Sequence, residues 1–286
     1  MKTSTHIQPL ANLVGKEKSI EIIAKAGFDA WDFSLFDMCR YNWAESKANV
    51  IANELNGDNY VSYAKKLRKI GEDNGIVCNQ SHAPFPSHDI TIDSYLKRAI
   101  ECTAIAGGEI CVIHPINYLS PTENAKFYRK FLDFAKQHNV KIATENMFGH
   151  DRNLDMVLPH ACGTAKNFYD HIQAVNDDYF VACVDIGHAE MKPIRTSACE
   201  IIYTLKDKVQ ALHIHDNDLY NDNHATPFTK NIKFEPIVKA LKDINYSGYL
   251  TLESDAHYKT GGYTADTALE GTIALYDSVK RLNDMF

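Results

Sequence analysis

Short apolar runs alternate with longer amphipathic stretches along the whole chain. The runs are rich in Ile, Val, Leu and Phe, and residues such as Gly, Pro, Asn and Asp separate them from the next stretch, a pattern typical of buried strands. We therefore expect strands at 7–14, 28–35, 76–82, 110–113, 140–145, 180–184, 209–213 and 249–252.

Between these runs, apolar residues recur every three or four positions, which is the spacing of one face of a helix. In the stretch 58–74, Tyr60, Ala64 and Leu67 share such a face. Pro121 opens another stretch, and proline is common at the first position of a helix. The expected helices cover 19–26, 58–74, 93–106, 121–138, 164–175, 197–205, 234–244 and 265–282.

This alternation of strands and helices predicts a parallel sheet covered by helices. An open, doubly wound sheet and a closed (β/α)8 barrel both satisfy the pattern. Eight expected strands in 286 residues favour the barrel, whose usual length is about 250 residues. No G-x-G-x-x-G motif follows the first expected strand, so the main signal of a dinucleotide-binding open sheet is missing. We predict an α/β protein that forms a single (β/α)8 TIM barrel over residues 1–286.

Composition and charge narrow the class of partners. The formal net charge of −7 lacks the basic excess of a nucleic-acid surface and suits a protein that handles small molecules. The seven cysteines are scattered without a C-x-x-C pair, as in proteins of a reducing compartment. The sequence shows neither a signal-peptide pattern nor an apolar run of membrane length, so we expect a cytoplasmic protein without membrane contact. The sequence does not indicate whether copies of the chain associate into a homo-oligomer.

Titratable side chains stand at the ends of the expected strands, about one strand–helix unit apart. The segment 209–217 begins as an apolar strand and ends with His213 and His215 on one face of the extended chain. In a parallel barrel all such ends open on one face. Carboxylates and imidazoles packed there would repel one another or stay neutral, and a divalent cation resolves this conflict. We therefore predict a metal site at the C-terminal face. Its candidate residues are His82, His114, Glu145, Asp185, His188, His213, Asp222, His224 and Glu253.

These strand ends resemble motifs of the xylose isomerase-like TIM barrels, which include sugar and sugar-phosphate isomerases and epimerases and, as a sister branch, endonuclease IV. The matching motifs are Ser-His-Ala-Pro at 81–84, Ile-His-Pro at 113–115, Ala-Thr-Glu-Asn at 143–146, Val-Asp-Ile-Gly-His at 184–188, Leu-His-Ile-His-Asp-Asn at 212–217 and Leu-Thr-Leu-Glu at 250–253. The resemblance implies one metal ion, with His188 placed at a substrate oxygen. The implied ligands of that ion are Glu145, Asp185, His213 and Glu253.

The resemblance differs between branches of the family. Ketose 3-epimerases carry a further Glu soon after the strand-five ligand and an Arg soon after the strand-seven histidine, whereas Asn217 stands in that second region here. The resemblance to endonuclease IV extends to a site for three zinc ions, in which Glu145 bridges two of them. The third ion would be held by His188, Asp222 and His224, and His82 and His114 complete the set. Some sugar-isomerase-like relatives keep this pattern as well.

We predict a metal-dependent sugar or sugar-phosphate isomerase or epimerase that works through a metal-stabilised enediolate. Glu145 and Glu253 would exchange the substrate proton as general base and acid, and His188 would orient a hydroxyl group. One nitrogen and three oxygen ligands suit Mn²⁺, Co²⁺, Mg²⁺ or Zn²⁺, and the additional histidines favour Zn²⁺.

The alternative is a zinc-dependent phosphodiesterase that cleaves DNA at abasic sites. Such an enzyme needs a cationic surface along the loops that face the DNA. The loops 34–57, 146–163 and 216–230 carry few Lys or Arg residues and several Asp residues, which favours the isomerase. A catalytically inactive binding barrel is disfavoured because every ligand type is present.

Two further groups of residues receive only a general prediction. The aromatic residues Phe36, Tyr41 and Trp43 either cap a sugar ring or pack within their loop. We expect surface or helix positions for five further histidines, namely His6, His88, His138, His160 and His171.

Overall fold

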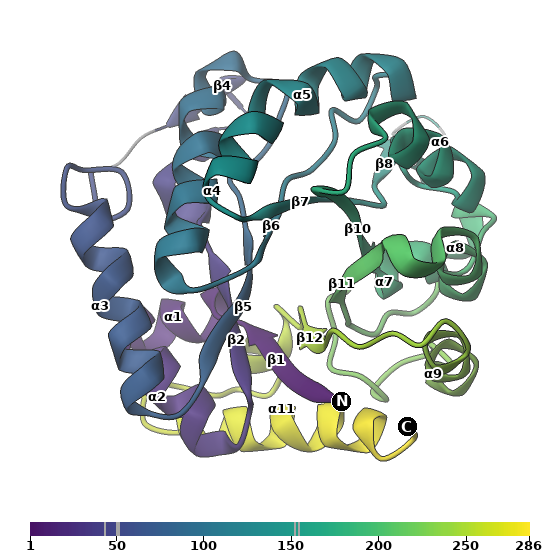
Figure 1. Ribbon diagram of the computed structural model, residues 1–286. Coiled ribbons are helices and arrows are strands. Elements are labelled where there is room, and N and C mark those ends of the chain that lie inside the picture. Colours follow the sequence, from purple (N-terminus) through teal and green to yellow (C-terminus); the bar gives the residue numbers. More distant parts are fainter. Residues whose placement is uncertain (43, 50–51, 152, 154) are drawn as a thin grey trace.

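The computed structural model describes residues 1–286 except 43, 50, 51, 152 and 154. Within the described residues, eight parallel strands form one sheet that curves into a nearly closed barrel, as predicted (Figure 1). Their order around the barrel is β11-β10-β7-β6-β5-β2-β1-β12, and a backbone bridge between Ile214 and Leu252 brings the two edges together. The strands are β1 (Lys2–His6), β2 (Ala30–Ser34), β5 (Val77–His82), β6 (Ile110–Val112), β7 (Lys141–Glu145), β10 (Phe180–Asp185), β11 (Val209–His213) and β12 (Tyr249–Leu252).

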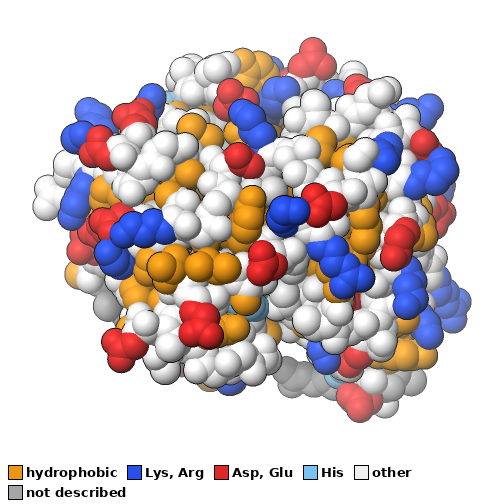
Figure 2. Space-filling model, turned by 90° about the horizontal axis from the view of Figure 1, so that it is seen from below, with side chains coloured by type: hydrophobic (Ala, Val, Ile, Leu, Met, Phe, Trp, Pro, Cys, Tyr) orange, Lys and Arg blue, Asp and Glu red, His pale blue; other side chains and the backbone are white. Residues whose placement is uncertain are grey.

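Helices surround this sheet on the outside (Figure 1). In chain order they are α1 (Gln8–Val14), α2 (Lys16–Ala26), α3 (Tyr60–Asp73), α4 (Asp93–Ala106), α5 (Pro121–Gln137), α6 (Ala165–Val175), α7 (Ile186–Glu190), α8 (Ala198–Leu205), α9 (Phe234–Asp243), α10 (His257–Thr260) and α11 (Ala268–Asn283). Short 3-10 helices lie at η1 (Phe36–Met38), η2 (Ile90–Ile92), η3 (Lys192–Ile194) and η4 (Lys206–Lys208). Seen from the side of α11, acidic and basic side chains are interspersed on the outer wall (Figure 2). No helix in the described part of the chain is long and apolar enough to cross a membrane.

The main apolar core lies between the sheet and the helices, and it fixes the strand ends that carry the candidate residues. Helix α5 begins at a capping box, in which Ser120 accepts a hydrogen bond from the backbone of Glu123 and the Glu123 side chain accepts one from Ser120. From this helix, the buried Tyr128 hydroxyl bonds to the carbonyl of Ile113 at 2.9 Å and to the Thr144 hydroxyl at 2.7 Å. Both partners directly precede a candidate metal ligand, so the helix holds the ends of two strands in register.

Our prediction of the first strand was wrong. The stretch 8–14 forms α1 instead, with Pro9 in the first turn, where its missing N–H group removes no helical hydrogen bond. The true first strand lies earlier, at β1, and contains Ser4 and His6 as buried polar residues. A strand whose buried side chains are polar lacks the apolar signature on which the prediction depended.

The other expected strands and helices lie within a few residues of their predicted bounds. The loop predicted at 146–163 contains an antiparallel hairpin of β8 (Phe148–Asp151) and β9 (Met156–Pro159). A second hairpin joins β3 (Arg40–Asn42) and β4 (Lys47–Asn49) within the loop predicted at 37–57. Both hairpins extend loops that follow carboxyl ends of barrel strands.

Hydrogen-bonded polar side chains occupy part of the barrel interior. The hydroxyl of Ser4 donates to Asn79 at 2.6 Å, and the Asn79 amide donates to Thr251 at 3.1 Å. Thr251 in turn lies 3.4 Å from Gln80, whose amide donates to Asp32 at 3.0 Å. These contacts form a connected interior network that leads from strand β1 to Asp32. Buried polar groups of this kind are stable only when they are hydrogen-bonded to one another.

Candidate metal centre

Glu145, at the end of β7, is the central carboxylate of the site. Its Oε2 atom lies 3.3 Å from Nε2 of His114 and 3.2 Å from Nδ1 of His213. The Nε2 atom of His82 lies 3.6 Å from the same oxygen, and Nδ1 of His213 lies 3.3 Å from Oε2 of Glu253. The Glu145 side chain is only 1% exposed, so these groups meet in a buried space.

The predicted residues fall into overlapping sets whose ligand atoms all lie within 4.8 Å of one another. Glu145 belongs to two of the sets named below, so these two share a carboxylate, whereas the third set does not contain Glu145. The structure thus brings together every residue predicted from the strand ends, and it adds His215. The sets that matter here are Glu145, Asp185, His213 and Glu253; His82, His114 and Glu145; and His188, His215, Asp222 and His224.

Asp222 organises the last of these sets. Its Oδ2 atom lies 3.0 Å from Nε2 of His224 and 3.6 Å from Nε2 of His188. Its Oδ1 atom lies 3.5 Å from Nε2 of His215. The same His215 nitrogen lies 3.2 Å from Oδ1 of Asp185. His215 therefore connects the Asp222 set to the Glu145 set.

Backbone carbonyls hold several of these imidazole rings in one orientation. The Nδ1 atoms of His188 and His224 lie 2.9 Å from the carbonyl oxygens of Asn146 and Glu253, respectively, and Nδ1 of His82 lies 3.1 Å from that of Ala83. A carbonyl accepts only from a protonated nitrogen, so the neutral ring keeps its lone pair on Nε2. In each ring Nε2 lies near a carboxylate, that of Glu145 for His82 and that of Asp222 for His188 and His224, and a free Nε2 lone pair beside a carboxylate suits a metal-ligating histidine.

His213 has the opposite orientation. Its Nδ1 atom faces Glu145 and Glu253, while its Nε2 atom lies 3.6 Å from Oδ2 of Asp32. A carboxylate beside one imidazole nitrogen holds the proton on that nitrogen and makes the other nitrogen a better metal ligand. For His213, Asp32 would hold the proton on Nε2 and leave the Nδ1 lone pair for a metal ion. Asp32 is fully buried and ends the interior network, so it is a positioning residue for His213.

Several buried polar atoms of the site have no hydrogen-bond partner among the described residues. They are Nε2 of His114, Oε2 of Glu145, Oδ2 of Asp185, both ring nitrogens of His213, Nε2 of His215 and Oδ1 of Asp222. A buried polar group left unpaired costs about 1–3 kcal/mol, so a fold that gathers this many needs a compensating ligand. A mixed set of imidazole nitrogens and carboxylate oxygens fits a divalent cation.

Charge pairing within the site shifts its pKa values. Burial alone would lower the pKa of His188, but the Asp185 and Asp222 carboxylates outweigh it and raise that pKa to about 10. Burial would raise the pKa of Asp222, yet His188 and His224 hold it well below its usual range. The histidines around Glu145 lower its pKa in the same way. The pKa values of His213 and His224 are raised in spite of burial, whereas burial lowers the pKa of His114. Without a cation, His188, His213 and His224 therefore pair with carboxylates in their protonated form, and a cation has to displace those protons.

A pocket of about 500 Å³ opens above these residues. Phenylalanine rings form part of its wall, and each packs against a candidate ligand. The pairs, with the distance between ring centroids, are Phe36 and His82 at 4.7 Å, Phe85 and His114 at 5.1 Å, and Phe148 and His188 at 4.9 Å. No Lys or Arg residue is found among the described residues that line the pocket. The pocket is thus large enough for a small organic ligand, and its described lining offers no Lys or Arg side chain to an anionic group.

Comparison with known proteins places the fold in a family. The family described as xylose isomerase-like TIM barrel matches residues 20–276. The chain belongs to this family. An uncharacterised protein of Methanocaldococcus jannaschii is 25% identical over 255 residues, which cover 82% of this chain and 78% of the relative.

Solved structures of other xylose isomerase-like barrels superpose over almost the whole chain. A D-tagatose 3-epimerase-like protein shares 19% identity at a TM-score of 0.69, with 99% of each chain covered. A D-psicose 3-epimerase determined in the presence of D-fructose shares 17% identity at a TM-score of 0.71, also with 99% of each chain covered. At such low identity these similarities establish the fold only.

The site of this xylose isomerase-like barrel also contains residues that were not predicted from the sequence. His215 was expected on the face of His213 but received no role. Asp32 was overlooked, although a carboxylate inside an apolar strand is a signal that it has a partner. The expectation for His6 was wrong, because this histidine ends β1 with 3% exposure and its Nδ1 lies 3.0 Å from Oδ1 of Asp255. Its misassignment follows from the misplaced first strand.

The aromatic residues of the loop after β2 differ in what they contact. Phe36 lines the pocket against His82. Tyr41 packs against His88, with ring centroids 5.8 Å apart. Trp43 lies outside the described residues. Of the two members of this group that the structure describes, Phe36 is the one that lines the pocket.

Proposed function

We propose that this protein is a divalent-metal-dependent isomerase or epimerase of uncharged sugars. The observation that carries the proposal is the convergence of buried, unpartnered carboxylate and imidazole atoms beneath an apolar-walled pocket. The family membership is consistent with it, since two solved relatives are a D-psicose 3-epimerase and a D-tagatose 3-epimerase-like protein.

The residues proposed to hold the metal are Glu145, Asp185, His213 and Glu253, with His82 and His114 beside Glu145. A divalent cation there would supply Lewis acidity, which polarises a substrate carbonyl and lowers the pKa of the adjacent C–H bond. The mixed nitrogen and oxygen donors suit Mn²⁺, Co²⁺ or Zn²⁺ and also allow Mg²⁺.

Proton transfer is assigned to Glu145 and Glu253. Their carboxylates flank Nδ1 of His213 at 3.2 and 3.3 Å, so both reach the same small volume. One, as a carboxylate, would accept the proton from the carbon beside the carbonyl, and the other, in its protonated form, would donate a different proton to the opposite face or to the neighbouring carbon. His188 lies close to both Glu145 and Asp222, where its ring can orient a substrate hydroxyl group.

The walls of the pocket favour a neutral sugar over a sugar phosphate. A phosphate group is usually bound by Arg, Lys or the N-terminus of a helix. Among the described lining residues, the polar groups are histidines, carboxylates, Ser87, Asn117 and the hydroxyl of Tyr118. The carboxylates would repel a phosphate, whereas sugar hydroxyl groups can donate hydrogen bonds to them.

The test is solvent proton exchange at the substrate carbon. Metal-loaded protein is incubated in D2O with D-fructose, D-psicose or D-tagatose, and deuterium incorporation is followed by proton NMR. We expect exchange at a carbon next to the carbonyl, accompanied by formation of an epimer or of an aldose. Retention of all carbon-bound protons with these and other neutral ketoses and aldoses would contradict the proposal.

A phosphodiesterase is the second candidate, and the Asp222 set is the observation that favours it. His188, Asp222 and His224 lie close enough to hold an additional metal ion, and clustered zinc ions can activate water and stabilise a leaving alkoxide. The absence of Lys and Arg from the described pocket lining argues against a DNA substrate. Cleavage of an abasic-site duplex or of bis(p-nitrophenyl) phosphate, without sugar exchange, would establish this second function instead.

Metal binding should strengthen as the pH rises. The carboxylates of Glu145 and Asp185, whose pKa values are lowered, are ionised across the neutral range, whereas His213, whose pKa is raised well above its usual value, must lose a proton to bind a cation. Each displaced proton changes the apparent affinity by about tenfold per pH unit. Competition with a chromogenic chelator at several pH values between 6 and 8, corrected for protonation of the chelator, measures the slope. A flat profile would contradict displacement of histidine protons.

A further inference from the structure

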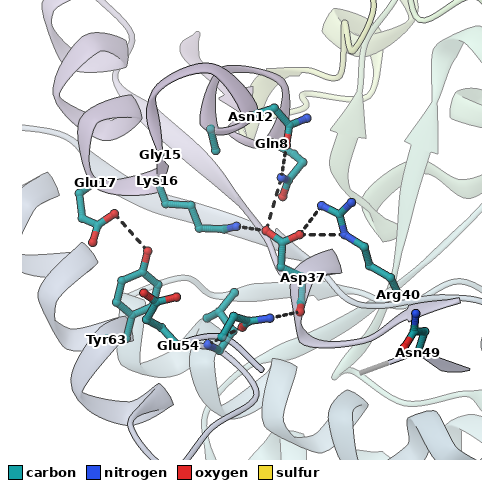
Figure 3. A pocket seen from close by; sticks show the side chains of 13 residues that line it. Gln8, Asn12, Gly15, Lys16, Glu17, Asp37, Arg40, Asn49, Glu54 and Tyr63 are labelled. Carbon is teal, nitrogen blue, oxygen red and sulfur yellow. Dashed lines mark hydrogen bonds and ion pairs between the residues drawn. The ribbon is translucent and has the colours of Figure 1, made fainter. Parts of the chain in front are cut away.

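A second hollow lies on the same face of the barrel as the metal centre. This polar pocket has a volume of about 460 Å³ and lies where α1, the start of α2 and the segment after β2 meet (Figure 3). It adjoins a smaller hollow of about 300 Å³, with which it shares Gln8, Asn12 and Arg40. The smaller hollow shares Phe36 and Phe85 with the pocket above the metal centre. The three hollows therefore lie next to one another, with the smallest between the metal centre and the polar pocket.

The charged groups of the polar pocket neutralise one another. Asp37 accepts hydrogen bonds from Lys16 and, at 3.0 Å, from Nε of Arg40 (Figure 3). Burial would raise the pKa of Asp37, but Lys16 and Arg40 outweigh it and lower the pKa, so the carboxylate is ionised. The remaining acidic groups among the described lining residues are Glu17 and Glu54. With its cations already paired and carboxylates in excess, the pocket is unsuited to a phosphate or another anion.

Gln8 presents an unused hydrogen-bond acceptor in this pocket. Its amide nitrogen donates to Oδ1 of Asn12 at 2.8 Å and lies 3.5 Å from Oδ2 of Asp37. Because an ionised carboxylate can only accept, these contacts fix which end of the amide is nitrogen. The Oε1 atom of Gln8 is buried and has no partner among the described residues, although the residue is only 8% exposed. A hydroxyl group of a ligand would satisfy it.

We propose that the polar pocket binds a second, non-reacting sugar unit of an uncharged disaccharide or glycoside. The reacting unit would lie above Glu145 and Glu253, and the chain of the substrate would cross the Phe36 and Phe85 rings, whose centroids are 5.1 Å apart. This assignment rests on the proposed function for the position of the reacting unit. Amide, carboxylate and guanidinium groups side by side can donate to and accept from sugar hydroxyls, and binding remote from the reacting carbon can be used to raise the rate there.

The experiment compares Gln8→Leu and Asn12→Ala with wild-type protein. Asn12 is exposed, so its truncation spares the core. Gln210→Leu is the matched control, because Gln210 lines a hollow of about 480 Å³ near the start of β11, at the opposite end of the barrel. Isothermal titration of metal-loaded protein with maltose, cellobiose and lactose is set against glucose, fructose and glucose 6-phosphate. The quantity of interest is the ratio of disaccharide to monosaccharide affinity.

We expect at least one disaccharide to bind about tenfold or more tightly than its component sugars. The loss of one hydrogen bond in Gln8→Leu or Asn12→Ala should lower that ratio by about tenfold, and Gln210→Leu should leave it unchanged. A ratio near one for every disaccharide, a ratio insensitive to Gln8→Leu and Asn12→Ala, or a preference for glucose 6-phosphate that depends on Gln8 would each overturn the proposal.

Deuterium exchange on the monosaccharides and on the disaccharides is measured in parallel, so the two proposals can fail separately. Exchange without a disaccharide preference would remove the second sugar site and leave the proposed function intact. A disaccharide preference that depends on Gln8, without exchange on any sugar, would support the binding site and contradict the isomerase.

Discussion

Replacing Glu145 with Gln is expected to abolish metal binding at the centre and to lower sugar turnover by about a thousandfold or more. Glu145 is the carboxylate nearest to His82, His114 and His213, and it belongs to more than one set of candidate ligands. Even residues behind a metal ligand usually change affinity by about 10–100-fold when they are mutated. Loss of a shared ligand, which is also the proposed proton acceptor, should exceed that range. Elemental analysis and deuterium exchange measure the two effects on one preparation.

His224→Ala is the matched comparison for this variant. His224 pairs with Asp222, away from the contacts of Glu145, so the variant should keep the ion held by Glu145. About one metal ion per chain in the wild type, lost in Glu145→Gln and kept in His224→Ala, is the outcome expected of the isomerase. Two or three zinc ions per chain, one of which is lost in His224→Ala, would favour the phosphodiesterase. A Glu145→Gln protein with full metal content would contradict the assignment of the centre.

Removing divalent cations with a chelator is expected to lower the melting temperature by about 10 °C. A ligand present at about a thousand times its dissociation constant stabilises the native state by ~4 kcal/mol, and a domain of this size shifts by about 2–4 °C per kcal/mol. The histidines offset part of the loss because they become protonated and pair with the carboxylates, as the raised pKa of His188 indicates.

Differential scanning calorimetry with and without the chelator measures this shift, and re-addition of Mn²⁺, Co²⁺ or Zn²⁺ should restore the melting temperature. The Glu145→Gln protein serves as the control, since it should be nearly insensitive to the chelator. A wild-type protein whose melting temperature responds to neither treatment would show that the buried pairs need no cation.

The C-terminal half of the barrel and most of the site could be predicted because the information is local. A parallel strand buried on both faces is an apolar run, and its end is marked by the first titratable residue, as at Glu145, Asp185 and His213. Equivalent ends of a parallel barrel share one face, so the topology alone brings such residues together. No knowledge of long-range contacts was needed for that step.

The parts that escaped prediction depend on side chains that face polar neighbours from distant strands. The buried faces of β1 carry Ser4 and His6, so the strand lacks an apolar run. Asp32 and His215 gain their roles only through contacts with His213, Asp185 and Asp222. The polar pocket depends on Gln8 and Asp37, which are 29 residues apart and meet only after folding. These residue types are common in any sequence, and only the contacts formed on folding give these particular residues a role.

The interior network from Ser4 through Asn79, Thr251 and Gln80 to Asp32 has a consequence for protein engineering. Barrel interiors are attractive targets for thermostabilisation, because replacing buried polar residues with Leu or Val usually adds apolar burial. Here those polar residues support the carboxylate behind His213. Apolar replacements in the interior would remove the support of that carboxylate, and we expect them to give a more stable barrel that binds the proposed metal ion less tightly.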